Sequence, residues 1–178
     1  TAFRGELVLQ DANDEPAEKL LERIKEERKK KLGKKYKEIE PVDEAELAEL
    51  PEGWKWVSVG DLETFIGSGI TPRGGKEVYV SEGIPFIRSQ NVHPDGLHLD
   101  DVAFVTPEMH NKMERTHIKP SDVLLNITGA SIGRSTFIPP DFGPANVNQH
   151  VCIIRTGWWI LPEYLSKFLN SQLGQEQI

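Results

Sequence analysis

The stretch DVLLNITGASIGRSTFI, residues 122–138, decides the fold class of this chain. An apolar run at residues 123–127 and a strand-like run at residues 135–138 flank a segment rich in Gly and Ser, which is typical of two short strands joined by a turn. The same pattern recurs on both sides of this stretch. Further strands are predicted at residues 54–59, 78–80, 85–87, 102–105 and 151–155.

Three helices are predicted around these strands. A short one covers residues 108–115, and another begins at Pro162 with an apolar side that includes Leu165 and Leu169. No helix between the strands is long enough for a parallel crossover. The part of the chain from residue 51 onward is therefore predicted to be a strand-rich α+β body closed by a C-terminal helix.

The third predicted helix lies near the N-terminus. Asn13 or Asp14 can cap it, Pro16 fits its first turn, and Gly33 is a suitable stop. Its apolar stripe is a candidate docking surface for a partner protein. The stripe contains Ala17, Leu20, Leu21 and Ile24. An acidic, proline-flanked linker follows, so residues 1–50 are predicted to form a helical segment plus linker.

Charge and composition limit the function. The 178 residues carry 21 Lys and Arg against 28 Asp and Glu, a net charge of −7, which argues against general binding to nucleic acid. Residues 23–37 hold nine bases and two acids, a pattern more typical of a solvated helix end than of direct DNA contact. No apolar run is long enough to span a membrane, and no signal peptide is evident. A single cysteine, Cys152, excludes a disulfide framework, and a cytoplasmic location is expected.

Motifs for catalysis or metal binding are weak. Gly67-x-Gly69 followed by Lys76 fits neither phosphate-loop fingerprint. Ser131 has the GxSxG spacing, but a strand pattern follows it where a nucleophile elbow needs a helix. His93 and His98 lie near several Asp residues without helical register or a third confident ligand, so no metal site is predicted.

Polar residues in the predicted loops offer a recognition chemistry. Arg and Lys bind guanine acceptors or phosphates, and Asn and Gln bind adenine. The same side chains also cap the backbone of turns, and composition alone does not separate the two roles. These residues are Arg73, Lys76, Arg88, Gln90, Asn91, Arg134, Asn146, Asn148 and Gln149.

The order of short sequence words carries a family resemblance. The words LPEGW (50–54), GITP (69–72), GIPFIR (83–88), TGASIGR (128–134) and VNQH (147–150) follow one another, and FRGELV (3–8) precedes them. In this order they resemble the specificity subunit of type I restriction-modification systems over nearly the whole chain. No single word is specific, but the order and spacing are.

The resemblance implies a non-catalytic protein of α+β, β-helix-like fold that recognises one half of a split double-stranded DNA target. Residues 51–178 would be the target recognition domain, and residues 1–50 part of the conserved helical spacer. Methyltransferase subunits and, through them, the restriction subunit would be the partners. S-adenosylmethionine, ATP and Mg would bind only to those partners. The chain would be part of a subunit or a half-length version of one.

Site residues follow from the same comparison. Residues in motifs that are shared by proteins of different specificity are poor candidates for base reading. Gly129, Gly133 and Pro72 are therefore expected to shape turns. Arg88, Thr128, Arg134 and Asn148 are expected to contact phosphate or brace loops. Base readers are expected at residues 73–77, 89–98 and 141–146, which include Arg73, Lys76, Gln90, Asn91, His93 and Asn146. Two alternatives remain: a protein–protein assembly module that uses the helix stripe and, more remotely, a hydrolase that uses Ser131.

Overall fold

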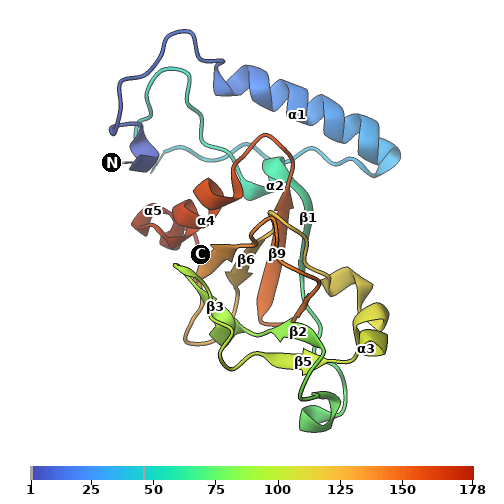
Figure 1. The fold of residues 1–178 in the computed structure, drawn as a ribbon. Helices are drawn as coiled ribbons and strands as arrows, with labels where there is room; N and C mark the ends of the chain where they lie inside the picture. The colour runs from blue at the N-terminus through green and yellow to red at the C-terminus, as the bar shows by residue number, and fades with distance from the viewer. Residues whose placement is uncertain (1, 46) are drawn as a thin grey trace. The chain divides into compact units, whose positions relative to one another are not determined.

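The computed structural model describes residues 2–45 and 47–178, apart from the side chains at positions 75 and 76. It divides into two compact units, Thr1–Thr64 and Phe65–Ile178 (Figure 1). No helix of the described residues has the length and apolar character needed to cross a membrane.

The first unit is built on the helix α1, Ala17–Leu32, as the apolar stripe predicted. Gly33 ends the helix with a φ of 51°, a left-handed conformation that glycine adopts without strain. The predicted caps are wrong, because Pro16 occupies the cap position and Ala17 N–H donates instead to Gly53 O at 2.8 Å. Short 3₁₀ turns lie at Ala2–Arg4 (η1) and Gly33–Lys35 (η2), and α2 covers Val59–Leu62.

The strand predicted at residues 54–59 is absent. The large residues of this alternating pattern are tryptophans whose indole groups form hydrogen bonds. Trp54 Nε1 donates to Gln10 Oε1 at 2.8 Å, and Trp56 Nε1 donates to Ala48 O at 2.9 Å. Ser58 then caps α2. Arg28 of α1 reaches this segment through a hydrogen bond to Gly60 O. Residues 51–64 therefore pack with the first unit, although their sequence pattern groups them with the second.

The second unit contains three sheets. The largest has the strand order β1-β9-β6-β7, the next β5-β2-β8, and the third is the hairpin β3-β4. β6 pairs antiparallel with both β7 and β9. The strands are β1 Glu63–Ser68, β2 Ile84–Ile87, β3 Val92–His93, β4 Gly96–Leu97, β5 Ala103–Val105, β6 Val123–Asn126, β7 Ser135–Phe137, β8 Asn146–Val147 and β9 Val151–Thr156.

The predicted α+β class is confirmed, with two local differences. Residues 78–80 form the end of a 3₁₀ turn (η3, Gly75–Val78) and one isolated bridge between Val80 and Phe104, so no full strand forms there. No long crossover helix lies between the described strands, as predicted, yet β2 pairs parallel with β8. The connection between them runs through residues 88–145, which include other strands, so one crossover helix is not required.

Apolar side chains of β2, β6, β8 and β9 fill the main core. Leu124 and Ile153 are register partners and are fully buried, because β6 and β9 lie inside the sheet. A smaller cluster joins Phe86, Val105 and Met113. The predicted short helix appears as α3, Pro107–Lys112, with η5 (Glu114–Thr116) after it.

The C-terminal helix is confirmed as α4, Pro162–Asn170, followed by α5, Gln172–Gln175. Leu165 and Leu169 of α4 are buried, and α4 contacts β6 and β7. The side-chain amide of Asn170 forms hydrogen bonds with the sheet edge as the backbone of a neighbouring strand would. Its Oδ1 accepts from Ser135 N–H at 3.1 Å, and its Nδ2 donates to Ser135 O at 2.7 Å. These bonds tie α4 to the edge strand β7.

Candidate nucleic-acid interface

Four loops meet at one end of the four-stranded sheet. β6 ends where its antiparallel partners β7 and β9 begin, and Gly69 N–H, just after β1, donates to Val151 O at 3.1 Å. The loop after β2 joins them, because Asn148 N–H donates to Ile87 O at 3.0 Å. We call the surface formed by residues 69–73, 88–91, 126–134 and 148–150 the loop edge.

A row of hydrogen-bonded side chains links three of these loops. Thr71 Oγ1 donates to Gln149 Oε1. Gln149 Nε2 lies 3.2 Å from His150 Nε2, and His150 Nδ1 lies 2.6 Å from Thr128 Oγ1. If the amide donates to Nε2, the ring hydrogen stays on Nδ1 and donates to the threonine. Thr71, Thr128 and Gln149 are exposed, so polar groups of this row face solvent.

The charge of the loop edge is opposite to that of the chain. Its four segments contain the arginines Arg73, Arg88 and Arg134 and no Asp or Glu, whereas the whole chain has a net charge of −7. Arg73 and Arg134 are exposed. Asp101, outside these segments, pairs with Arg88 at 3.8 Å. The exposed Arg73 and Arg134 therefore carry the positive charge of this surface, which is suited to phosphate because phosphate contacts require Lys or Arg.

The loop after β2 is held from inside by a polar network. Asn91 is fully buried, and its amide donates to His98 O and Asp101 Oδ1, both at 2.9 Å. Its Oδ1 accepts from Arg88 N–H. Arg88 also donates to Asp101 O at 2.6 Å, and Gln90 donates to the Asp101 carboxylate. This network fixes the η4 turn, Ser89–Asn91.

Burial separates bracing residues from exposed ones among the predicted DNA contacts. A direct base-reading role does not fit Asn91 or Asn146, because both side chains are fully buried and bonded within the chain. Asn146 bonds to His110 Nδ1 at 2.6 Å and to Thr116 Oγ1 at 2.7 Å. Asn148 is nearly buried and accepts from His150 N–H at 3.1 Å. We assign all three to holding the loops in place.

The other predicted contacts lie nearer the surface. Arg73, Gln90, Thr128 and Arg134 are exposed on the loop edge, and Arg88 is partly exposed. His93 lies on β3, just outside the loop edge, and is half-buried. The backbone of Lys76 lies in η3, and its side chain is outside the described residues. Sequence reasoning did not select Thr71 and His150, although both stand in words that carry the family resemblance.

Buried Asn126 joins the loop after β2 to the loop between β6 and β7. Its Nδ2 donates to Ser89 O at 2.8 Å and to Ser131 Oγ at 3.0 Å. Its Oδ1 is buried and has no hydrogen-bond partner among the residues that the structure describes. The sequence did not indicate a role for Asn126. An Asn at the end of an apolar strand pattern gives no sign of which loops its side chain will join.

Glycine geometry shapes the loop edge as expected. Gly129 and Gly133 have φ values of 79° and 85°, in the left-handed region that glycine tolerates. Gln175 of α5 then holds the turn by donating to Gly133 O at 2.9 Å. Gly69 passes so close to β8 that an added Cβ would lie 2.0 Å from Val147 O. Close backbone packing thus sets the position of these loops.

Ser131 does not stand on a nucleophile elbow. It lies in the turn that leads into strand β7, and its Oγ is bonded to Asn126. The histidine of this edge, His150, is bonded to Thr128. The arrangement therefore lacks the strand–turn–helix context that GxSxG catalysis requires.

The helix stripe is largely covered within the described structure. Ile24 is 2% exposed, and Leu20 and Leu21 are half-buried. Arg28, on the next turn, is anchored to Gly60 O and Glu63 O at 2.6 Å each. An open docking stripe, as predicted from these residues, does not fit the burial of Ile24.

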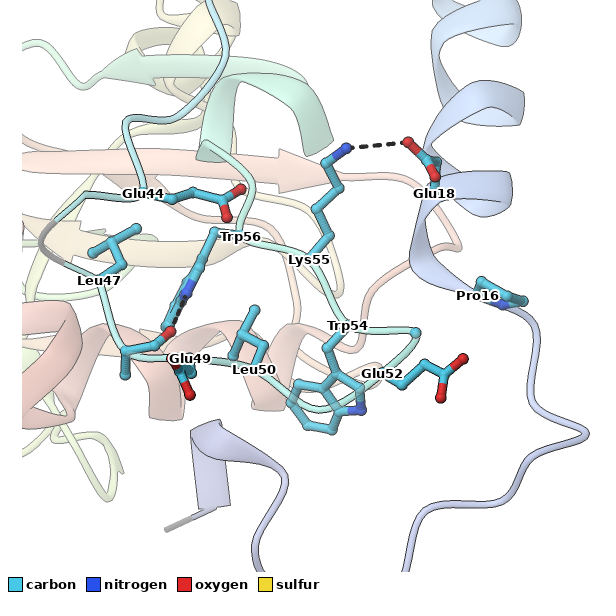
Figure 2. A pocket seen from close by; sticks show the side chains of 12 residues that line it. Pro16, Glu18, Glu44, Leu47, Glu49, Leu50, Glu52, Trp54, Lys55 and Trp56 are labelled. Atoms are coloured by element: carbon cyan, nitrogen blue, oxygen red, sulfur yellow. Dashed lines mark hydrogen bonds and ion pairs between the residues drawn. The ribbon is translucent and has the colours of Figure 1, made fainter.

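The first unit also contains a pocket of about 610 Å³, drawn in Figure 2. Trp54 and Trp56 supply its aromatic lining, and Lys55 Nζ reaches Glu18 Oε1 at 3.4 Å. Among its described lining residues are four glutamates and one lysine, so its charge disfavours phosphate. The glutamates are Glu18, Glu44, Glu49 and Glu52. This pocket is therefore not the candidate interface.

Comparisons with known proteins agree with the resemblance. No protein-family model matches the chain. Over 131 residues, 71% of its length, it is 33% identical to the type I restriction enzyme EcoAI specificity subunit of Escherichia coli. The chain is homologous to type I restriction specificity subunits. Over 88 residues, 47% of its length, it is 39% identical to the EcoEI specificity subunit of the same organism. This specificity-subunit homologue spans 22% and 15% of the lengths of these two relatives.

Solved structures show the same fold. A chain from work on "complex assembly and conformational transition of the type I R-M system" matches 86% of this homologue with a TM-score of 0.52 and 18% identity, and 36% of that chain is covered. The HsdS subunit from Thermoanaerobacter tengcongensis matches 86% with a TM-score of 0.50 and 20% identity, and 38% of it is covered. The fold class predicted from the sequence is shared with both.

Proposed function

We propose that the second unit is a DNA-recognition body that directs a type I restriction-modification complex to one half of a split target. The charge of the loop edge carries this proposal: its four segments contain three arginines and no acid, in a chain of net charge −7. Homology to specificity subunits supports the same function. The assembly-module alternative is not favoured, because Ile24 of its stripe is buried.

The exposed residues divide into two roles. Arg134 and Arg88 belong to words shared across the family, so we assign them to the phosphate backbone, which positions a protein without reading sequence. Arg73 and Gln90 lie outside those words and are exposed. Their guanidinium and amide groups match guanine and adenine edges in the major groove. We assign base reading to them.

Partners supply the chemistry in this proposal. Methyltransferase subunits would bind the specificity subunit and carry S-adenosylmethionine. The restriction subunit would join through them and use ATP and Mg. The chain itself would be non-catalytic and would act in the cytoplasm, where its DNA target lies.

A domain exchange tests the proposal. Residues 65–178 of the intact specificity subunit would be replaced by the equivalent segment of a relative with a different target, and the methylated bases of host DNA would be mapped by sequencing. We expect one half of the split target to change and the other half to persist. An unchanged target would contradict base recognition by this unit.

A matched pair of variants tests the role of Arg73. Arg73→Ala should weaken specific binding by about 1–3 kcal/mol, the usual value of a bidentate base contact. Arg115→Ala, which removes an arginine of η5 outside the loop edge, should leave binding nearly unchanged. Equal effects of the two substitutions would indicate general electrostatics and exclude base reading by Arg73.

A further inference from the structure

The hairpin β3-β4 brings three potential metal ligands together. His93 ends β3, Asp95 lies in the turn, and His98 follows β4. One ligand atom from each residue lies within 4.8 Å of the other two. Along the chain these residues lack helical register, so the short hairpin, with His93 opposite Gly96, creates the grouping.

Hydrogen bonding prepares His93 for coordination. Its Nε2 lies 2.9 Å from Gln90 O. A carbonyl oxygen only accepts, so Nε2 carries the hydrogen and the lone pair stands on Nδ1. A metal-binding histidine commonly donates its other ring N–H to a backbone carbonyl in this way, which fixes the tautomer and the ring orientation.

The other two ligands are close to each other and reachable from solvent. His98 Nε2 donates a hydrogen bond to the Asp95 carboxylate at 3.2 Å. A metal ion that replaces this hydrogen would find the two atoms near the separation of about 3.3 Å between two ligands of a tetrahedral zinc ion. The rings of His93 and His98 stack with centroids 3.9 Å apart. Asp95 and His98 are exposed, so their side chains can rotate toward an ion without displacing the core.

We propose that His93, Asp95 and His98 form a binding site for a first-row transition metal ion of the zinc type. Two imidazole nitrogens and one carboxylate suit zinc, copper or nickel better than calcium or magnesium, which prefer oxygen ligands. Three protein ligands leave a fourth tetrahedral position open to solvent. The ion would lock the hairpin tip. This inference is independent of the proposed DNA recognition.

Calorimetric titration of the full chain with zinc chloride tests the site. We expect one saturable equivalent per chain. His98→Gln and Asp95→Asn should each weaken binding at least about ten-fold, the usual effect of losing a ligand or its support. Both side chains are exposed, and far-ultraviolet circular dichroism verifies that the variants fold.

Asp100→Asn is the matched control, because it removes an exposed carboxylate of the same segment that is outside the cluster. This variant should bind zinc like the unmodified chain. Cobalt chloride gives a second readout, since a tetrahedral site with nitrogen and oxygen ligands produces visible absorption. Absence of saturable binding, or equal binding by the folded His98→Gln variant, would overturn the proposal.

Discussion

Arg155 and Asp122 form a bidentate ion pair inside the second unit. Arg155 Nε donates to Asp122 Oδ1 at 2.6 Å, and its Nη2 donates to Oδ2 at 2.7 Å. The Asp122 side chain is fully buried. It also accepts from Lys119 N–H at 2.7 Å. The pair therefore ties β9 to the turn that precedes β6.

Removing Arg155 from this pair should destabilise the protein strongly. Arg155→Ala leaves a buried carboxylate without its cation, and breaking a buried pair costs about 3 kcal/mol or more. Urea unfolding followed by circular dichroism measures the loss. Lys167→Ala breaks the exposed Lys167–Glu163 pair on α4 and should cost less than about 1 kcal/mol. Similar losses in the two variants would mean that the buried pair contributes no more than a surface one.

Gly69 should not tolerate a side chain. In Gly69→Ala the new Cβ would lie 2.0 Å from Val147 O and 2.4 Å from Asn148 O. Both are backbone atoms, so strands must shift, and we expect a loss of at least about 1–3 kcal/mol in unfolding free energy. Gly143→Ala should be nearly neutral, because no described residue beyond its chain neighbours comes within 4 Å of the added Cβ. A neutral Gly69→Ala would show that β1 and β8 are not packed this closely.

Arg134 should contribute salt-dependent affinity for DNA. If its exposed guanidinium neutralises one phosphate, Arg134→Ala should weaken binding to target and non-target duplexes alike. It should also reduce the salt slope of the binding constant by about 1. Fluorescence anisotropy over a range of salt concentrations measures both. Lys112→Ala, on α3, should leave the slope unchanged, and a specific loss for the target alone would assign Arg134 to base reading.

Cys152 should react slowly with thiol reagents in the folded protein. Burial raises the pKa of this thiol from its ordinary value of 9.0, and the thiolate is the reactive form. We expect iodoacetamide labelling at mildly alkaline pH to be at least about ten-fold faster in denaturing urea. The unfolded thiol ionises first, so this group's contribution to stability falls as pH rises above about 9. Rapid labelling without denaturant would show that β9 opens readily.

Local pattern predicted most strands of the second unit and the helix of the first, but it also predicted a strand in the first unit that does not form. Residues 123–127 and 151–155 are apolar enough to be buried strands in any arrangement, and β6 and β9 are found there. Residues 54–59 alternate as a strand does, yet their Trp side chains bond to Gln10 and Ala48. Contacts with distant residues decided that conformation, and no local signal indicates them.

The candidate site shows the same division between local and distant information. The sequence marked the polar loops, but it could not separate Asn91 and Asn146, which are fully buried, from exposed Gln90. All three have similar turn-like surroundings in the chain. Asn91 and Asn146 are buried against partners that lie 7 and 36 positions away in the chain, respectively. The same holds for Thr71 and Gln149, which are hydrogen-bonded across 78 positions.

The sequence by itself determined the α+β class, the charged helix, the closing helix and the family resemblance, because apolar spacing and ordered motifs are properties of the chain alone. Only the tertiary structure decided which strands pair, which loops share one sheet end, and that His93, Asp95 and His98 converge. The physical reason is that strand pairing joins residues far apart in the chain. Side-chain burial, and hence which polar groups are free to bind, follows from that pairing.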